Sequence, residues 1–159
     1  MSKILVVYYS LTGNTKLIAE TIAESINAKI LALKPVKELK AESGRTYIWG
    51  GYQAKMKRKP KLKEFDINPL DYELIILGTP VWAWTFSPPI RSFLSKFNLS
   101  NKNVALFMSH DGRGVKAMKR FKEILKDSNI LGEIGFEKPQ KYEQNEIKEK
   151  AIAWVKEIV

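Results

Sequence analysis

Residues 10–15 read SLTGNT and directly follow the apolar run ILVVYY at residues 4–9. The segment offers three hydroxyl groups, an amide and a glycine, with no Lys, Arg, Cys or Asp. If a strand passes here into a helix, the unpaired N–H groups of the helix start carry a partial positive charge into the segment. Neutral donors at this density suit a phosphate monoester held by hydrogen bonds. A hydroxyl-rich turn that only caps a helix would have the same sequence pattern, so this alternative stays open.

Other phosphate and hydrolase sites lack their motifs in this sequence. There is no G-x-x-x-x-G-K-[ST] segment for a nucleoside triphosphate and no G-x-S-x-G segment for a hydrolase. The chain has no Cys, which excludes a cysteine phosphatase, thiolate metal sites and disulfides. A phospho-accepting receiver domain needs an Asp where a strand ends, but the strand predicted from ILVVYY ends in Tyr8-Tyr9, and the one predicted from LIIL at residues 74–77 ends in Gly78-Thr79.

Two indole side chains stand in GTPVWAWTFSPP at residues 78–89, directly after the apolar run LIIL. Large aromatic side chains at the mouth of a sheet offer a stacking wall for a flat ring. Trp82 and Trp84 could instead cover the edge of the core, and this alternative stays open.

A third polar segment, SHDGRG at residues 109–114, follows the apolar run VALFM. GRGVKA at 112–117 matches a loose dinucleotide pattern, but that fingerprint belongs on the first strand-to-helix turn. Ser109, His110 and Asp111 are neighbours whose side chains diverge, so they do not form a catalytic triad. We interpret His110 as a rim residue and expect Asp111 and Gly112 to meet a polar ring edge.

These segments need strands that bring them together. Five short apolar runs are continuous rather than alternating, as in strands buried on both faces. They cover residues 4–9, 30–33, 74–77, 104–108 and 130–136. Strands alternating with helices predict a three-layer α/β/α sandwich with a five-stranded parallel sheet. Ligands bind outside the carboxyl ends of such strands, where the three polar segments lie.

Helical periodicity fills three of the four intervals and the C-terminus. Ser87, as an N-cap, followed by Pro88 predicts the start of the helix in the third interval. In the fourth interval the spacing predicts one buried face for Val115, Met118, Phe121 and Leu125.

The second interval, residues 34–72, breaks this rhythm. Irregular connections longer than about 12–15 residues are usually functional or disordered. Aromatic residues such as Tyr47 and Trp49 favour a binding loop. Six cations and no acid occur within residues 55–63. This run is interpreted as a solvated loop, as a docking surface for an acidic redox partner, or as a grip on the phosphates of NADPH.

Composition limits the class of protein. The 159 residues suit a single domain spanning 1–159, and 45% hydrophobic content suits a globular one. No apolar run approaches the roughly 20 residues of a membrane span, so we expect a cytoplasmic protein without membrane contact. The net charge of +10 attracts anions. The net charge is the only feature that favours a nucleic-acid-binding module, and no recognition motif accompanies it.

The three segments together resemble the flavodoxin family in its short form. SLTGNT resembles the family's [ST]-x-T-G-x-T phosphate loop, GTPVWAW…PP resembles the loop along the flavin ring, and LFMSHDGRG resembles the loop at the ring's polar edge. The resemblance implies the strand order 2-1-3-4-5 and one non-covalent FMN. It implies that the phosphate is held by Ser10, Leu11, Thr12, Gly13, Asn14 and Thr15, the ribityl chain and ring by Pro80, Val81, Trp82, Ala83, Trp84 and Thr85, and the pyrimidine side by Ser109, His110, Asp111 and Gly112. Trp49 or Tyr47 would cover the other ring face, beside Gly50 and Gly51.

The resemblance implies electron transfer between redox partner proteins, with no metal and no catalytic side chain. The alternative of the same fold is an NAD(P)H-dependent FMN oxidoreductase acting on a quinone or small molecule. Either one would be a monomer or a homodimer. The family's electron carriers are typically acidic, whereas this chain is strongly basic.

Overall fold

The computed structural model describes residues 3–37 and 58–159. Tyr47, Trp49, Gly50 and Gly51, together with the first part of the basic run at 55–57, lie outside the described residues. The roles suggested for them stay predictions.

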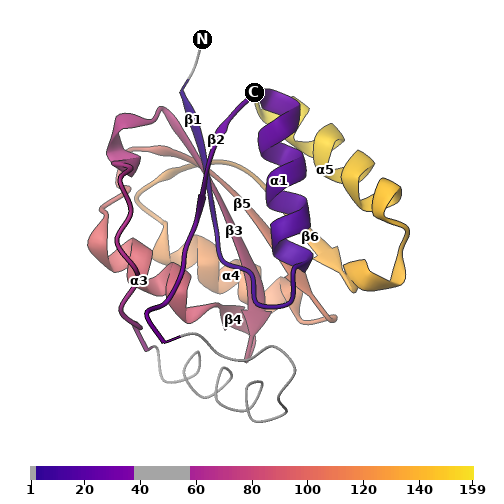
Figure 1. Cartoon of the computed structure of the whole chain (residues 1–159), viewed down its shortest axis with the longest axis horizontal. Coiled ribbons are helices and arrows are strands. Elements are labelled where there is room, and N and C mark those ends of the chain that lie inside the picture. Colours follow the sequence, from indigo (N-terminus) through magenta and orange to yellow (C-terminus); the bar gives the residue numbers. More distant parts are fainter. Residues whose placement is uncertain (1–2, 38–57) are drawn as a thin grey trace.

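The five predicted strands form one parallel sheet. They are β1 (Ile4–Tyr8), β2 (Lys29–Ala32), β3 (Leu74–Trp82), β5 (Asn103–His110) and β6 (Asn129–Glu137). Their order β2-β1-β3-β5-β6 confirms the expected arrangement, and each neighbouring pair runs parallel (Figure 1). A sixth strand, β4 (Thr85–Phe86), pairs antiparallel with the end of β3 and is an addition to the expected five.

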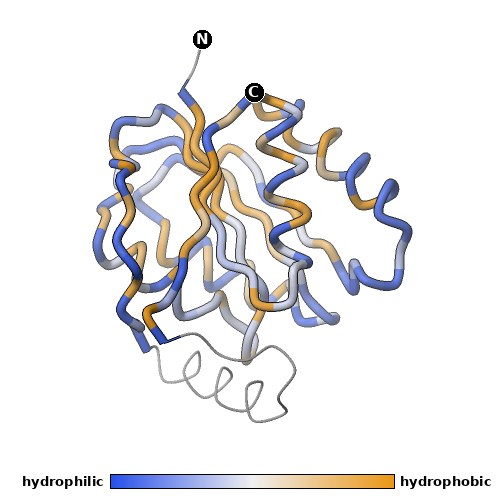
Figure 2. Tube along the Cα trace, viewed as in Figure 1, coloured by the Kyte–Doolittle hydropathy of each residue, from blue (hydrophilic) through white to orange (hydrophobic). Residues whose placement is uncertain are grey.

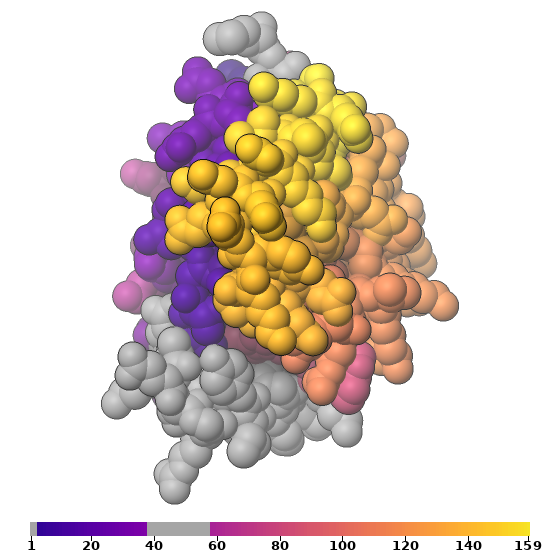
Figure 3. All heavy atoms as spheres, turned by 90° about the vertical axis from the view of Figure 1, so that its right-hand side faces the viewer, coloured from indigo at the N-terminus to yellow at the C-terminus, as the bar shows by residue number. Residues whose placement is uncertain are grey.

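Helices cover both faces of the sheet. One face carries α1 (Asn14–Ile26) and α5 (Gln144–Ile158), which lie side by side over β1 and β6 (Figures 1 and 3). The other carries α3 (Pro88–Lys96) and α4 (Gly114–Ile124). Two short 3₁₀ turns, Pro69–Asp71 and Pro139–Lys141, precede β3 and follow β6.

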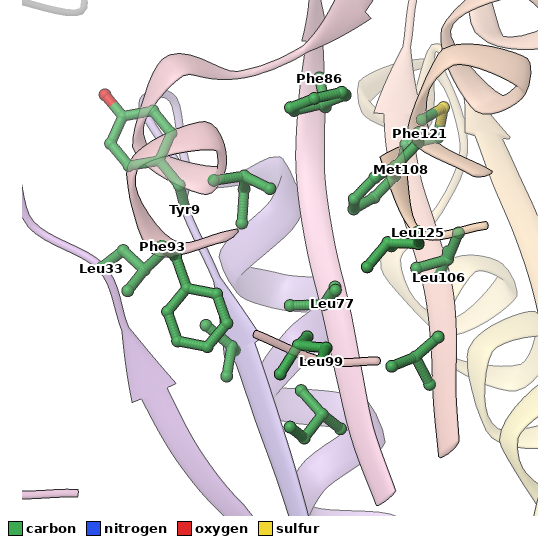
Figure 4. Close-up of a cluster of buried hydrophobic side chains, with 14 of the residues drawn as sticks. Tyr9, Leu33, Leu77, Phe86, Phe93, Leu99, Leu106, Met108, Phe121 and Leu125 are labelled. Carbon is green, nitrogen blue, oxygen red and sulfur yellow. The ribbon is translucent and has the colours of Figure 1, made fainter. Parts of the chain in front are cut away.

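Each face has its own core cluster because the strands are apolar on both sides. Figure 2 shows the apolar residues concentrated along the strands and the polar ones outside. Phe93 and Phe121 belong to the α3/α4 cluster, part of which Figure 4 shows, and Ile22 and Trp154 belong to the α1/α5 cluster. Gly78 in β3 lets the Phe107 ring of β5 lie against the backbone, since a Cβ there would overlap that ring. These contacts fix β3 and β5, whose carboxyl ends carry two of the polar segments.

Two local predictions turn out differently. Val115 is 91% exposed and not part of the buried α4 face, because the face turned to the sheet runs through Gly114, Ala117, Met118 and Phe121, and Gly114 holds the buried position in the first turn. Ser87 is the N-cap residue of α3, with Pro88 and Pro89 in the first turn as predicted, but its side chain makes no capping bond. Its hydroxyl instead pairs with Thr79 Oγ1 at 2.9 Å.

Within the described part of the chain, no helix combines the length and apolar character needed to cross a membrane.

Candidate functional site

The carboxyl ends of β1, β3 and β5 meet at one pocket of about 230 Å³. It lies where the chain winds outward in both directions from the β1–β3 pair, which is the switch point at which such sheets bind ligands. All three polar segments contribute to it. The lining residues are Leu11, Thr12, Asn14, Thr15, Pro80, Val81, Trp82, Ser109, His110, Asp111, Pro139 and Gln140.

The start of α1 is open to an anion. Gly13, the N-cap residue, has φ 103°, and no side chain of the described residues makes a capping hydrogen bond to the helix. Ser10 Oγ turns back and accepts a hydrogen bond from the Gly13 N–H at 3.1 Å. The first turn also contains no acidic residue. The N–H groups of that turn therefore keep the partial positive charge of a helix start.

A buried hydroxyl pair joins the first and third segments. Thr15 Oγ1 lies 2.9 Å from Ser109 Oγ, and both side chains are almost fully buried. The pair ties the first turn of α1 to the end of β5. One hydroxyl of such a pair donates to the other, which leaves a single O–H free to donate to a ligand.

The two indoles have different surroundings. Trp82 lines the pocket and meets the Tyr9 ring edge-on at 5.7 Å between centroids. Trp84 is 46% exposed and is not part of the pocket lining. The Arg113 guanidinium lies 4.5 Å from the centre of the Trp84 ring, and Arg120 donates to the Trp84 carbonyl at 3.2 Å. Of the two predicted stacking residues, the structure brings only Trp82 into the pocket.

His110 separates this pocket from a larger hollow between α4 and β6. That hollow measures about 620 Å³ and shares His110 with the first pocket. Gly112 N–H donates to His110 Nδ1 at 3.1 Å, which requires an unprotonated Nδ1. A Cβ at Gly114 would lie 2.5 Å from His110 Nε2, so glycine makes room for the ring. Burial lowers the pKa of His110, although Glu137 and Asp111 raise it and Lys150 adds to the lowering.

Several predicted site residues lie beside the pocket without lining it. Ser10 and Gly13 shape the loop, Ala83 and Thr85 belong to the β3–β4 hairpin, and Gly112 faces the larger hollow. Thr85 Oγ1 is buried and has no hydrogen-bond partner in the described part of the chain. Trp49 lies outside the described residues.

Pro139 and Gln140 are pocket residues that the sequence analysis missed. They form the 3₁₀ turn after β6, the last strand of the sheet. The available clue was that every parallel strand ends at the same edge, so the segment after the fifth apolar run belonged with the other three.

The arrangement combines an uncapped helix start, neutral hydroxyl and amide donors, and an indole wall in one pocket. This donor set fits a phosphate monoester attached to a flat ring system. The fold and site together define a doubly wound α/β protein with an anion-binding first loop.

Comparison with known proteins gives the family. The family model described as Flavodoxin matches residues 3–158, and the chain belongs to the flavodoxin family. A flavoprotein from Lactobacillus acidophilus, solved in complex with FMN, is 26% identical and aligns over 85% of this chain and 93% of its own, with a TM-score of 0.75.

Two further solved structures agree in fold. A candidate flavoprotein from Bacteroides eggerthii is 22% identical, with a TM-score of 0.78 over 99% of this chain and 98% of its own. Oxidised flavodoxin 2 from Bacillus cereus is also 22% identical, with a TM-score of 0.61 over 97% of this chain and 95% of its own.

Proposed function

We propose that the chain binds one FMN non-covalently and carries electrons between redox partner proteins. The observation that carries the proposal is the uncapped start of α1, which shares a pocket with Trp82. Family membership and the likeness to a flavoprotein solved with FMN support it. When bound, FMN supplies one- and two-electron chemistry, while the protein supplies position and electrostatics.

The residues of the chain have distinct tasks in this proposal. The N–H groups at the start of α1 and the side chains of Thr12, Asn14 and Thr15 hold the phosphate. Trp82 lies against the ring, and its own position is set by Tyr9. Asp111 and the loop that follows meet the polar edge.

A second candidate is an FMN-dependent NAD(P)H oxidoreductase. The observation that favours it is the exposed cations at Arg58, Lys59, Lys61 and Lys63, which form no ion pair with any described residue and could bind the phosphates of NADPH. In this case the chain would reduce a quinone or another small molecule directly.

The absorption spectrum tests the proposal first. The purified protein, or the apoprotein after FMN addition, should show a flavin spectrum shifted from that of free FMN. Anaerobic NADPH should then leave the flavin absorption unchanged until a separate reductase is added. Rapid bleaching by NADPH alone would overturn the carrier proposal in favour of the oxidoreductase.

A further inference from the structure

Two segments of the long second interval form a short antiparallel ribbon. Val36 N–H donates to the Lys61 carbonyl at 2.8 Å, and Lys63 N–H donates to the Lys34 carbonyl at 2.7 Å. Between these bonds, Pro35 pairs with Leu62. The ribbon exposes six cations, which we call the basic ribbon: Lys34, Lys37, Arg58, Lys59, Lys61 and Lys63.

The basic ribbon is anchored to the core. Leu33, which is buried, precedes it, and Leu62 packs on the α3/α4 cluster. Ser92 Oγ of α3 donates to the Pro60 carbonyl at 2.5 Å. In residues 60–63 the side chains alternate, with Lys61 and Lys63 exposed and Pro60 and Leu62 half-buried. The anchored backbone therefore holds the Cα positions of these lysines in place.

No acid within the ribbon balances these charges. Residues 33–37 and 58–63 contain no Asp or Glu. The three ion pairs in the described residues involve other side chains, at Lys16, Arg113 and Lys122. Alternate residues of an extended strand are about 6.6 Å apart, so Lys61 and Lys63 repel each other. An external anionic surface would relieve this repulsion.

The ribbon begins next to the proposed FMN pocket. Leu33 N–H donates to the Tyr8 carbonyl at 2.8 Å, so the ribbon continues directly from the carboxyl end of β2 beside β1. Tyr9 lies close to Leu33 in the core, with its hydroxyl pointing away from the other labelled side chains (Figure 4). The Tyr9 ring also contacts Trp82, which lines the pocket. Figure 1 shows the ribbon segments at the edge where the strands end.

We propose that the basic ribbon docks the acidic surface of a redox partner protein and brings that partner to the Trp82 side of the pocket. The inference rests on the proposed function. The cations form an extended array rather than converging on one point, so they match several carboxylates better than a single phosphate. Complementary charge of this kind steers association and speeds it at low ionic strength.

The test compares two double variants with equal charge change. Lys61→Glu/Lys63→Glu reverses the ribbon, and Lys126→Glu/Lys156→Glu reverses two exposed lysines near the ends of α4 and α5, at the opposite edge of the sheet. Each lowers the formal net charge from +10 to +6. The FMN-loaded proteins are reduced anaerobically and mixed in a stopped-flow instrument with the soluble domain of cytochrome b5, an acidic haem protein, or with basic cytochrome c.

At low salt the ribbon variant should transfer electrons to cytochrome b5 at a rate at least roughly tenfold lower than that of the wild type. The rate of cytochrome b5 reduction should fall far less in the opposite-edge variant. The wild-type rate should fall as the salt concentration rises. With cytochrome c the ribbon variant should be faster than wild type. Titration of labelled cytochrome b5 with each unreduced protein, followed by fluorescence anisotropy, should give the same ranking without any electron transfer.

Equal losses in the two variants would overturn the proposal, because net charge alone would then explain the rates. Unchanged cytochrome b5 kinetics with loss of NADPH, duplex DNA or anionic-vesicle binding in the ribbon variant would overturn it in favour of that ligand. FMN uptake is measured first in every variant. Failure of the wild type to bind FMN contradicts the proposed function, whereas intact FMN binding with equal losses contradicts only the docking surface.

Discussion

Gly13 has a backbone conformation that only glycine adopts readily. Its φ is 103°, and a Cβ added there would meet nothing within 4 Å. A substitution at this position therefore costs backbone strain without a steric clash in the protein. The loop needs this conformation to turn the Ser10 hydroxyl back onto its own backbone.

Replacement of Gly13 by alanine should lower the free energy of unfolding by about 1–2 kcal/mol, the cost of a left-handed conformation in a residue with a Cβ. Gly13→Asn should lose less, because asparagine tolerates positive φ better. Urea unfolding of the two variants measures the difference. Equal stability of wild type and Gly13→Ala would show that the loop does not hold this conformation in solution.

His110 should give the protein a measurable pH dependence. Burial lowers its pKa, and the Gly112 N–H bond requires an unprotonated Nδ1, so the folded state favours the neutral ring. The unfolded chain binds the proton more readily, so this stability is present above the unfolded pKa of about 6.5 and is lost as pH falls below it. Glu137 and Asp111 oppose the lowering and Lys150 reinforces it.

The check is urea unfolding between pH 7.5 and 5 in wild type and His110→Asn. Asparagine presents a side-chain oxygen that can accept the Gly112 N–H and does not titrate. The variant should lose less stability over this range, by an amount on the order of 1 kcal/mol, the worth of one hydrogen bond. Identical pH slopes would contradict the assigned role of His110, because the two proteins differ only at this residue.

Residue types predicted the donors of the first loop but not the different environments of the two indoles. Trp82 and Trp84 are separated by one residue, and only the tight turn at Ala83 and Trp84 sends the second ring to the Arg113 side. A two-residue turn normally carries Asn or Gly at such positions. The residues at this turn, Ala83 and Trp84, are not typical turn residues, so the sequence did not predict the turn.

At the scale of elements, the β3–β4 hairpin is strained at its turn. Ala83 and Trp84 have φ of 49° and 58°. The hairpin persists because other contacts hold it: Ser87 N–H donates to Thr79 Oγ1 at 2.9 Å, and Arg120 binds the Trp84 carbonyl. These contacts place Trp82 at the pocket.

Ala83→Gly should therefore raise the free energy of unfolding, by about 1 kcal/mol, because glycine removes the left-handed strain. Ala153→Gly is the matched control in an exposed interior position of α5, where it should lower stability by about 0.5–1 kcal/mol. Thermal or urea unfolding of the two variants should thus give opposite signs. A loss in both would mean that the turn is not strained in solution.

The elements were predictable where hydrophobic pattern and length agreed. The five continuous apolar runs correspond to the five parallel strands. The central strands β1, β3 and β5 are buried between two helix layers, whereas the edge strands β2 and β6 are only partly buried. β4 has only two residues, too few for any period. Val115 was placed on the buried face of its helix by spacing, yet the buried residue of the first turn of α4 is Gly114, whose small size gave no hydrophobic signal. The basic ribbon pairs residues 34–37 with residues 58–63, and the local sequence pattern does not show such contacts between distant segments.

At the scale of the whole molecule, the charge of +10 acts on any anion near the pocket. A unit positive charge about 10 Å away in water stabilises an added negative charge by about 0.4 kcal/mol. For a one-electron couple this corresponds to about 17 mV. The midpoint potentials of bound FMN should therefore be less negative than in an acidic flavodoxin.

Salt provides the check on this prediction. Raising the ionic strength from about 10 mM to 500 mM screens the surface charges. Redox titration should show the potential becoming more negative with salt, and an acidic flavodoxin measured alongside should shift in the opposite direction. A low-salt potential as negative as that of the acidic protein would contradict the prediction.

The central claim is that neutral donors at the first turn of α1 bind a phosphate group while the ring lies against Trp82. Parallel titration of the apoprotein with FMN and with riboflavin, followed by flavin fluorescence, tests it most directly. The account predicts saturable one-to-one quenching by FMN and at least roughly tenfold weaker binding of riboflavin, the worth of about 1.4 kcal/mol. Equal affinity for both flavins, or no uptake of either, would contradict it.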